Sequence, residues 1–392
     1  MKERREKGSG SITKINNNKY QARLKYKGHN YNAYFDSEKE ASKQLIIVKN
    51  QIDLGQYFKP CTVKLGDYLS EWLSLYALES VKQSTYMSYT GYINGHIIPN
   101  IGGIPLATLT TDQLQTFFVK KKKGGRLDGK AGGLSDKTLR NIFNMLHLAL
   151  EQAVESKKIM YNPINAVKLK AHVTPEMRVL SVDEQNALMS HVKASDRIES
   201  FGILFTLLTG IRFGELLGLK WSDFDFNNKT FKIRRTLNRL QKVDTENNAS
   251  NKTEIVLSTP KSIQSNRKVP VFNSLWIDLL EYKSKQELLF GELGITSQGF
   301  FISNYLGSPM EQRTYTDLYK KLYSISGITD ATFHTLRHTF ATRALEAGMD
   351  VNVLASILGH ADPSVTLKVY AHALPDHKKE SMDKMECYYN AE

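Results

Sequence analysis

The segment HTLRHTF, residues 334–340, contains side chains that could bind either a metal or a phosphate group. His334 and His338 are four residues apart and His334 and Arg337 are three apart, so either pair would share one face of a helix. Two imidazoles at this spacing could form half of a metal site, whereas an imidazole beside a guanidinium could bind a phosphate. The segment by itself leaves both interpretations open.

The metal interpretation lacks its remaining ligands. Residue 335 is Thr, so the H-E-x-x-H pattern is absent, and no acidic cluster lies nearby. His360 and His372 could be recruited, but only by a particular fold. We therefore expect no metal and no cofactor, and we interpret His338 as a residue of helix packing.

Other separated polar residues in apolar surroundings could complete a phosphate site. Arg212 follows the apolar run FGILFTLLTGI, with Glu215 three residues further on, so the flanking helices would carry the arginine inward. On that stretch alone, a buried Arg212–Glu215 ion pair that holds two helices together is the alternative. Lys261 starts a hairpin in a strand-rich region, and Tyr370 ends the run LKVY. Taken singly, that lysine would be a surface residue and that tyrosine a core or interface residue.

Together these residue types could transfer a phosphoryl group without a metal. The arginine fork matches two phosphate oxygens, so Arg212 and Arg337 could hold both non-bridging oxygens and stabilise a pentavalent transition state. Tyrosine titrates near ~10. Tyr370 would therefore need nearby cations or a base in order to act as a nucleophile at neutral pH.

The charge of the chain favours nucleic acid as a partner. The 392 residues carry a formal charge of +13 with a pI near 9.4, and a basic surface attracts polyanions, although a merely basic enzyme is the alternative. Residues 1–60 hold 13 Lys/Arg against 6 Asp/Glu, a net of +7. No apolar run approaches the ~18 residues of a membrane span. The N-terminus has no signal-like segment and only two cysteines occur, so we expect a cytoplasmic protein.

The first 60 residues predict a small three-stranded sheet followed by a helix. The run YQARLKYK, residues 20–27, alternates with period two and would place one basic face of the sheet toward solvent. That face would contain Arg23, Lys25 and Lys27. Ser37 begins an S-x-x-E capping box that opens a helix to about residue 54. A basic strand face indicates a DNA-binding sheet, and a solvated outer face is the alternative.

Residues 63–170 predict an independent domain of four or five helices. Amphipathic stripes mark the helices, one of which we expect to end before Pro99, and a T-x-x-Q box at Thr110 opens another. Residues 120–133 form a glycine-rich basic stretch that we expect to be a loop, either a linker or an arm that contacts phosphates. Its candidate DNA-binding residues are Lys120, Lys121, Lys122 and Lys123.

Residues 178–392 predict an α+β domain with a C-terminal tail. An S-x-x-E box at Ser181 opens it, helices dominate, and the strands between residues 229 and 272 are expected in one patch. The fold class is therefore multidomain and mainly α with α+β parts, divided as 1–60, 63–170 and 178–392. No phosphate-binding glycine loop is present.

The order of several motifs resembles that of the tyrosine recombinase, or phage integrase, family. These motifs are TGIRFGELLGLKW, TPKSIQSNRKVPV, HTLRH and LGHADPSVTLKVY. The run YQARLKYKGHNYNAYFDSEKEA resembles the arm-binding domain of integrases from conjugative transposons and Gram-positive phages, and the middle block resembles their core-binding, SAM-like domain. The resemblance covers essentially the whole chain, and its motifs are specific jointly rather than singly.

The resemblance implies a role for each candidate residue. Tyr370 would attack the scissile phosphate to form a 3′-phosphotyrosyl link, Arg212 and Arg337 would hold the phosphate, and Lys261 would protonate the leaving 5′-oxygen. His334 would act in acid–base chemistry or donate to the phosphate, and His360 would donate to the phosphate. Glu215 would orient the site.

The resemblance also implies a function and partners. The chain would cut and rejoin double-stranded DNA at core and arm attachment sites, as a homotetramer, to integrate and excise a mobile element or prophage. An excisionase and a host architectural protein would assist it on the bacterial nucleoid. The alternatives are a DNA-binding regulator with a degenerate catalytic domain, a DNA-relaxing enzyme similar to type IB topoisomerases, and a metal-dependent nuclease.

Overall fold

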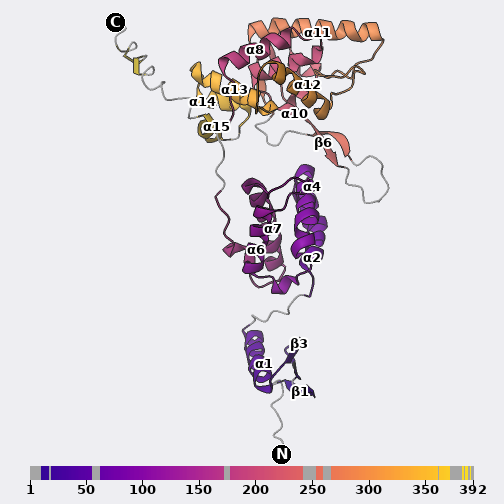
Figure 1. The fold of residues 1–392 in the computed structure, drawn as a ribbon, viewed down its shortest axis with the longest axis vertical. Coiled ribbons are helices and arrows are strands. Elements are labelled where there is room, and N and C mark those ends of the chain that lie inside the picture. The colour runs from indigo at the N-terminus through magenta and orange to yellow at the C-terminus, as the bar shows by residue number, and fades with distance from the viewer. Residues whose placement is uncertain are drawn as a thin grey trace, which may run out of the picture. The chain divides into compact units, whose positions relative to one another are not determined.

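The chain is described by a computed structural model that forms two compact units, Met1–Val173 and Thr174–Glu392 (Figure 1). The structure describes residues 10–16, 19–54, 62–171, 177–241, 253–258, 266–360, 362–370, 382–383, 385–386 and 389. Within the first unit, buried apolar residues form separate clusters in residues 22–52 and 65–167. The division into three domains stays a prediction.

The N-terminal part of the first unit is a three-stranded antiparallel sheet packed on one helix. Its elements are β1 (Ser11–Asn16), β2 (Lys19–Tyr26), β3 (His29–Phe35) and α1 (Glu38–Asp53), with strand order β1-β2-β3. The predicted cap forms, because the Ser37 hydroxyl accepts a hydrogen bond from the backbone N–H of Glu40. Ala22 and Leu24 point from β2 into the apolar cluster that α1 completes.

Only two of the three predicted basic residues share the outer face of this sheet. Arg23 and Lys25 are exposed and lie opposite Asn32 and Asn30 of β3. Lys27 instead lies in the turn after β2 with a left-handed φ of 45°, and its ammonium group forms an ion pair of 2.7 Å with Asp53 of α1. The turn ends the strand alternation, so the prediction that places Lys27 on this face is wrong.

The second part of the first unit is entirely helical in its regular structure. Its helices are α2 (Leu65–Trp72), α3 (Leu78–Ser80), α4 (Gln83–Tyr92), α5 (Ile98–Ile101), α6 (Thr111–Lys123) and α7 (Asp136–Glu155), and π-helical turns at Leu73–Ala77 and Ile93–Ile97 join α2 to α3 and α4 to α5. The sequence predicts that this helix ends before Pro99, but the helix continues through Pro99 to Ile101. Pro99 occupies the first turn of α5, where its missing N–H is tolerated.

The predicted basic loop begins later than expected, because Lys120–Lys123 form the last turn of α6. The capping box at Thr110 that opens this helix is present in full. Lys121 is buried, with 7% of its surface exposed, and burial lowers its pKa. Lys122 is exposed and forms an ion pair of 2.6 Å with Asp136, while Lys120 and Lys123 are exposed. Lys121 would therefore have to leave this buried position before it could contact a DNA backbone.

The second unit is α+β and combines helices with small sheets. Its helices are α8 (Val182–Lys193), α9 (Phe201–Thr209), α10 (Phe213–Gly218), α11 (Asn273–Leu293), α12 (Gln312–Ile325), α13 (Phe333–Glu346), α14 (Val351–Leu358) and α15 (Pro363–Tyr370). Its strands are β4 (Phe224–Asp225), β5 (Thr230–Lys232), β6 (Thr236–Gln241), β7 (Thr253–Ser258) and β8 (Lys268–Pro270). The capping box at Ser181 opens α8 as predicted.

The described strands of this unit follow one another between Phe224 and Pro270 with no α-helix among them, as expected, and they form two sheets. One sheet has the order β4-β5-β8, and β6 pairs with β7 in a separate hairpin. The apolar helix α9 is buried along nearly its whole length in the main core, while α13 and α14 contribute a second cluster. Because α9 is packed in the core, the residues at its two ends are held in fixed positions within the unit.

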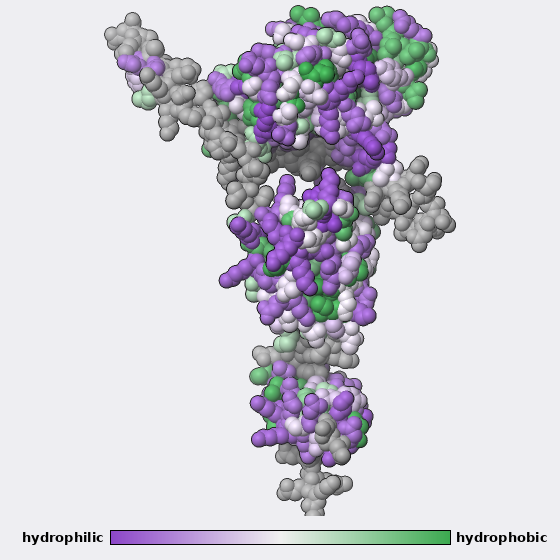
Figure 2. Space-filling model, viewed as in Figure 1, coloured by the Kyte–Doolittle hydropathy of each residue, from purple (hydrophilic) through white to green (hydrophobic). Residues whose placement is uncertain are grey.

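The visible surface of the unit is mixed in character. Figure 2 shows hydrophilic residues over most of this face and a hydrophobic area at one end of α11. The exposed apolar side chains of that helix include Ile277, Leu288 and Leu293. Within the described residues, no helix is long and apolar enough to cross a membrane.

Candidate phosphate-binding site

Three arginines from distant parts of the sequence meet at the C-terminal end of helix α14. The last carbonyls of a helix have no partner inside it, and they carry the negative end of the helix dipole. Arg267 donates to the carbonyl of Ile357. Arg337 Nη2 donates to the Leu358 carbonyl at 2.8 Å, and Arg212 Nη2 donates to the Gly359 carbonyl at 3.1 Å. The helix end therefore holds three guanidinium groups side by side.

Arg212 is positioned by the turn that links α9 to α10. Gly210 ends α9 with a left-handed φ of 66°, and a Cβ atom there would lie 2.5 Å from the ring of Phe340, so the position requires glycine. Arg212 then precedes α10, and its backbone N–H donates to Glu215 Oε2 at 3.1 Å. Its side chain donates through Nη1 to Glu215 Oε1 at 2.8 Å. The predicted pair of Arg212 and Glu215 is thus present, with the arginine half-buried and the carboxylate buried.

Arg337 comes from the buried face of α13 and has only 2% of its surface exposed. Its Nη1 donates to the carbonyl of Gly210 at 2.8 Å, and its Nη2 lies 2.9 Å from His360 Nε2. These contacts join α13 to the turn that carries Arg212 and to the residue that follows α14. The structure therefore brings the two predicted arginines and His360 together.

Arg267 belongs to the same site, and the sequence analysis missed it. It donates through Nη1 and Nη2 to the two oxygens of Glu215, at 3.1 and 3.0 Å. A signal was available, because Arg267, Val269 and Val271 alternate with exposed residues. This period places the arginine on the buried face of the strand that contains β8.

The carboxyl group of Glu215 is ionised in this setting. Burial by itself would raise its pKa, but the charges and hydrogen bonds of Arg267 and Arg212 outweigh that effect and lower the pKa to about 2. Glu215 is therefore a fixed negative charge that two guanidinium groups share.

His360 links the arginines to helix α15. A guanidinium only donates hydrogen bonds, so His360 Nε2 accepts from Arg337 and the ring proton must lie on Nδ1. Nδ1 in turn lies 2.7 Å from the hydroxyl of Thr366, a fully buried residue of α15. Burial and the nearby charges of Arg337, Arg212 and Arg267 lower the pKa of His360 to about 4, so the ring is neutral at pH 7. In this state Nε2 offers no proton to a phosphate.

His334 and His338 lie on α13 with ring centroids 4.8 Å apart. Burial is the main cause that lowers the pKa of each ring to about 4, and Arg337 lowers both further. The His334 residue is exposed and His338 is half-buried. Among the described residues, no group of three or more His, Cys, Asp or Glu side chains could hold a metal ion.

Two predicted catalytic residues are described only in part or not at all. Lys261 lies outside the described residues. Tyr370 is the last residue of α15, and its side chain lies outside the described part of the chain. The backbone of α15 nevertheless connects Tyr370 to Thr366, one helical turn earlier, and so to His360.

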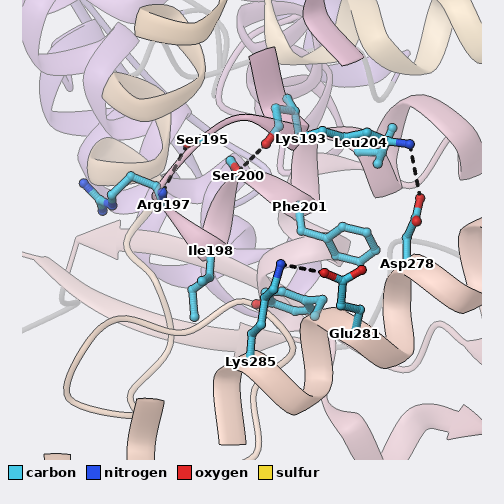
Figure 3. A pocket seen from close by; sticks show the side chains of 12 residues that line it. Lys193, Ser195, Arg197, Ile198, Ser200, Phe201, Leu204, Asp278, Glu281 and Lys285 are labelled. Carbon is cyan, nitrogen blue, oxygen red and sulfur yellow. Dashed lines mark hydrogen bonds and ion pairs between the residues drawn. The ribbon is translucent and has the colours of Figure 1, made fainter. Parts of the chain in front are cut away.

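A separate cavity of about 320 Å³ lies at the N-terminal end of α9 (Figure 3). Its lining charges are paired, with Lys285 2.7 Å from Glu281 and Lys193 3.8 Å from Asp278. None of the predicted site residues lines it. This cavity is therefore distinct from the arginine cluster at the other end of α9.

Comparison with known proteins shows the family. The profile described as "Phage integrase family" matches residues 178–377, and that described as "Phage integrase, N-terminal SAM-like domain" matches residues 64–122. The chain is 28% identical over 363 residues to the "Tyrosine recombinase XerC-like" protein of Caldanaerobacter subterraneus subsp. tengcongensis, covering 90% of each chain. It is 25% identical over 351 residues to the ICEBs1 integrase of Bacillus subtilis, covering 89% of this chain and 90% of that protein.

Solved structures share the fold. The Tn1549 transposon integrase, solved in complex with a circular intermediate DNA, matches 82% of this chain and 99% of that chain with a TM-score of 0.65 and 21% identity. A lambda integrase tetramer bound to a Holliday junction matches 93% of this chain and 96% of that chain, with a TM-score of 0.54 and 18% identity. With the profile match over half of its length, the chain belongs to the phage integrase family of tyrosine recombinases.

Proposed function

We propose that this protein is a site-specific DNA recombinase that cuts and rejoins DNA strands to integrate and excise a mobile element or prophage. The observation that carries the proposal is the convergence of Arg212, Arg337 and His360 at the end of α14. Two arginines and a histidine fixed on separate elements can surround one phosphate, and family membership supplies the reaction class.

The proposed reaction is the one that the family resemblance implies for these groups. The Tyr370 hydroxyl gives its proton to a base, the role proposed for His334, and its oxygen attacks the scissile phosphorus. The phosphotyrosyl bond forms as the bond from phosphorus to the 5′-oxygen breaks. Lys261 gives a proton to that leaving oxygen. A 5′-hydroxyl of the partner strand then reverses these steps, so the bond energy is conserved and neither ATP nor a metal enters the reaction.

Arg212 and Arg337 stabilise the charge that develops on the non-bridging oxygens. A bound phosphate would accept the Arg337 hydrogen bond that His360 Nε2 accepts in the free protein. Its negative charge would also raise the pKa of His360, which the arginines lower to about 4. His360 then takes up a proton and donates to the phosphate, and His334 assists proton transfer at the tyrosine.

We propose that Arg23 and Lys25 bind arm sites through the outer face of the N-terminal sheet, where both are exposed. Lys120 and Lys123, exposed at the end of α6, would contact the phosphates of core DNA, and Lys122 would do so after release from Asp136. Each phosphate contact that is lost should flatten the salt dependence of binding by about one unit of log–log slope.

We propose that the working assembly is a homotetramer on DNA, and that an excisionase and a host architectural protein direct it on the bacterial nucleoid. The tetrameric form reported for lambda integrase, which shares this fold, supports the first statement. Strand exchange between purified attachment-site plasmids, measured with and without a host extract, tests the proposal that accessory proteins direct the reaction.

A nicked DNA substrate that traps the covalent intermediate tests the central proposal. The wild-type protein should form a covalent adduct in the presence of EDTA, and Tyr370→Phe should form none while still binding the DNA. An adduct that survives Tyr370→Phe would refute the nucleophile, and loss of wild-type activity in EDTA would refute the metal-free mechanism. Relaxation of supercoiled DNA without any strand exchange would favour the topoisomerase-like alternative.

A further inference from the structure

We propose that Arg267 is a positioning residue that holds Arg212 in its phosphate-binding orientation through the shared carboxylate of Glu215. This inference rests on the proposed recombinase function and adds a residue that the predicted set did not include. Arg267 itself does not contact the reacting phosphate.

The hydrogen bonds of Glu215 form a closed arrangement. Oε1 accepts from Arg212 Nη1 at 2.8 Å and from Arg267 Nη1 at 3.1 Å. Oε2 accepts from the Arg212 backbone N–H at 3.1 Å and from Arg267 Nη2 at 3.0 Å. These four donors occupy the four acceptor positions of a carboxylate. Glu215 therefore cannot rotate toward or away from Arg212 without also moving Arg267.

Arg267 also fixes the end of helix α14. Its Nε donates to the carbonyl of Ile357, two residues before the Gly359 carbonyl that Arg212 contacts. The guanidinium packs directly beneath Gly359, where a Cβ atom would lie 2.9 Å from Arg267 Cδ and Nη1. Gly359 has a left-handed φ of 65°, so the sharp turn and the close approach both require glycine. Arg267 thus sets the position of the turn that leads into His360.

The burial of Arg267 distinguishes its role from that of Arg212. The Arg267 side chain is 6% exposed, whereas the Arg212 side chain is 32% exposed. Arg212 can therefore extend toward a ligand, while Arg267 lies behind it with its fork on Glu215. A planar fork is needed for this contact, and lysine would offer only a single point of attachment.

The structure supplies a matched control in the same unit. Arg235 donates to both oxygens of the buried Asp223, at 2.7 and 3.2 Å, and its Nη1 also contacts a backbone carbonyl. Its side chain is 23% exposed and that of Asp223 is 1% exposed. In the described part of the chain, Arg235 and Asp223 form no hydrogen bond or ion pair with Arg212, Arg337 or His360. Arg235→Lys therefore removes a similar buried fork without touching the site.

The experiment compares Arg267→Lys with Arg235→Lys in the full-length protein. We would measure single-turnover cleavage of the nicked substrate, DNA affinity by fluorescence anisotropy and the melting temperature. Both variants should lower the melting temperature by similar amounts and keep DNA affinity within about twofold, because binding is spread over many phosphates. Only Arg267→Lys should slow cleavage, by about 100-fold, the scale of losing one aligned donor. Cleavage by Arg267→Lys within about threefold of the wild-type rate, or an equal loss in Arg235→Lys, would overturn the proposal.

A double-mutant cycle tests the route through Glu215. If Arg267 acts through this carboxylate, Arg267→Lys should slow Glu215→Gln by no more than about threefold further. Losses that multiply would show that Arg267 acts independently and would overturn the inference. Absence of a Tyr370-dependent adduct with the wild type would instead overturn the proposed function, and this inference with it. A normal wild-type adduct with unimpaired Arg267→Lys would overturn the inference alone.

Discussion

The two ends of helix α9 differ in how their charges are balanced. At its N-terminal end, a cavity of about 320 Å³ is lined by lysines that each lie beside a carboxylate (Figure 3). At its C-terminal end, the guanidinium groups of Arg212 and Arg267 share the single carboxylate of Glu215, and Arg337 donates to backbone carbonyls. Positive charge is therefore balanced locally in the cavity and held in excess at the arginine cluster.

Under the proposed function, the excess of positive charge, rather than the size of a cavity, marks where the phosphate would bind. A DNA backbone is too large to enter a small cavity, and it binds where positive donors reach a surface. Exposed ion pairs such as Lys285–Glu281 contribute little to stability or binding. The buried cluster instead aligns donors before the substrate arrives.

The largest expected effect is on the cleavage rate when an arginine is replaced at one end of α9 but not at the other. Arg212→Lys should reduce the single-turnover cleavage rate by about 10³-fold, because an ammonium group cannot reproduce the two-pronged phosphate contact. Affinity for a core-site duplex should change by no more than about twofold. Arg197→Lys at the cavity end, where the arginine pairs with Glu199, is the control and should cleave normally. A loss of affinity that accounts for the whole effect would contradict the assignment.

A smaller effect is expected when the link between His360 and α15 is removed. Thr366→Val keeps the shape of the side chain but deletes the oxygen that accepts from His360 Nδ1. Cleavage should fall by about tenfold, less than the ~10²–10⁴-fold of a whole acid–base group because His360 itself remains, and its pH profile should shift. Thr366→Ser keeps the hydroxyl and should restore most of the rate. Equal losses in the valine and serine variants would indicate packing alone.

The free energy of unfolding should depend on pH through the buried histidines near the arginine cluster. The folded-state pKa values of His338 and His360 are lowered to about 4, below the ordinary value of 6.5. Between these values the unfolded chain binds more protons than the folded one, so the free energy of unfolding should decrease as pH falls from about 6.5 to 4. Urea unfolding of the DNA-free protein at a series of pH values measures this. Replacing both histidines with glutamine should flatten the profile in that window, and an unchanged profile would contradict the pKa assignment.

The smallest effect is expected at the cavity. The double variant Glu281→Gln with Lys285→Met removes one exposed pair of its lining, and cleavage and DNA affinity should both remain within about twofold of the wild type. The same cleavage and anisotropy measurements apply. A reduction comparable to that of Arg212→Lys would show that the cavity takes part in the reaction and would break the contrast between the two ends of α9.

Much of the local structure could be predicted from short-range patterns. Ser37, Thr110 and Ser181 cap helices where the sequence placed them, because a cap depends on residues three positions apart. Pro99 and the run Lys120–Lys123 were misjudged for a related reason. Propensity rules describe isolated segments, whereas neighbouring helices can stabilise a proline in a first turn or bury a lysine.

The candidate site could be predicted only in part. Arg212 was predicted from the apolar run that would carry it inward, and Arg337 from its spacing of three residues from His334. Arg267 and Thr366 were missed, since each resembles an ordinary residue of a strand or a helix until its partner is known. The alternation of Arg267 with Val269 indicates burial of the arginine, but it cannot name Glu215 as the acceptor.

The sequence by itself determined the basic character of the chain, the caps and faces of its helices, and the order of the motifs that mark its family. Only the tertiary structure decided that Arg212, Arg267 and Arg337 meet at the last turn of α14. The physical reason is range. Periodicity and capping depend on neighbours within one helical turn, whereas the carbonyls at this helix end accept from arginines that lie 21, 90 and 147 positions away in the sequence.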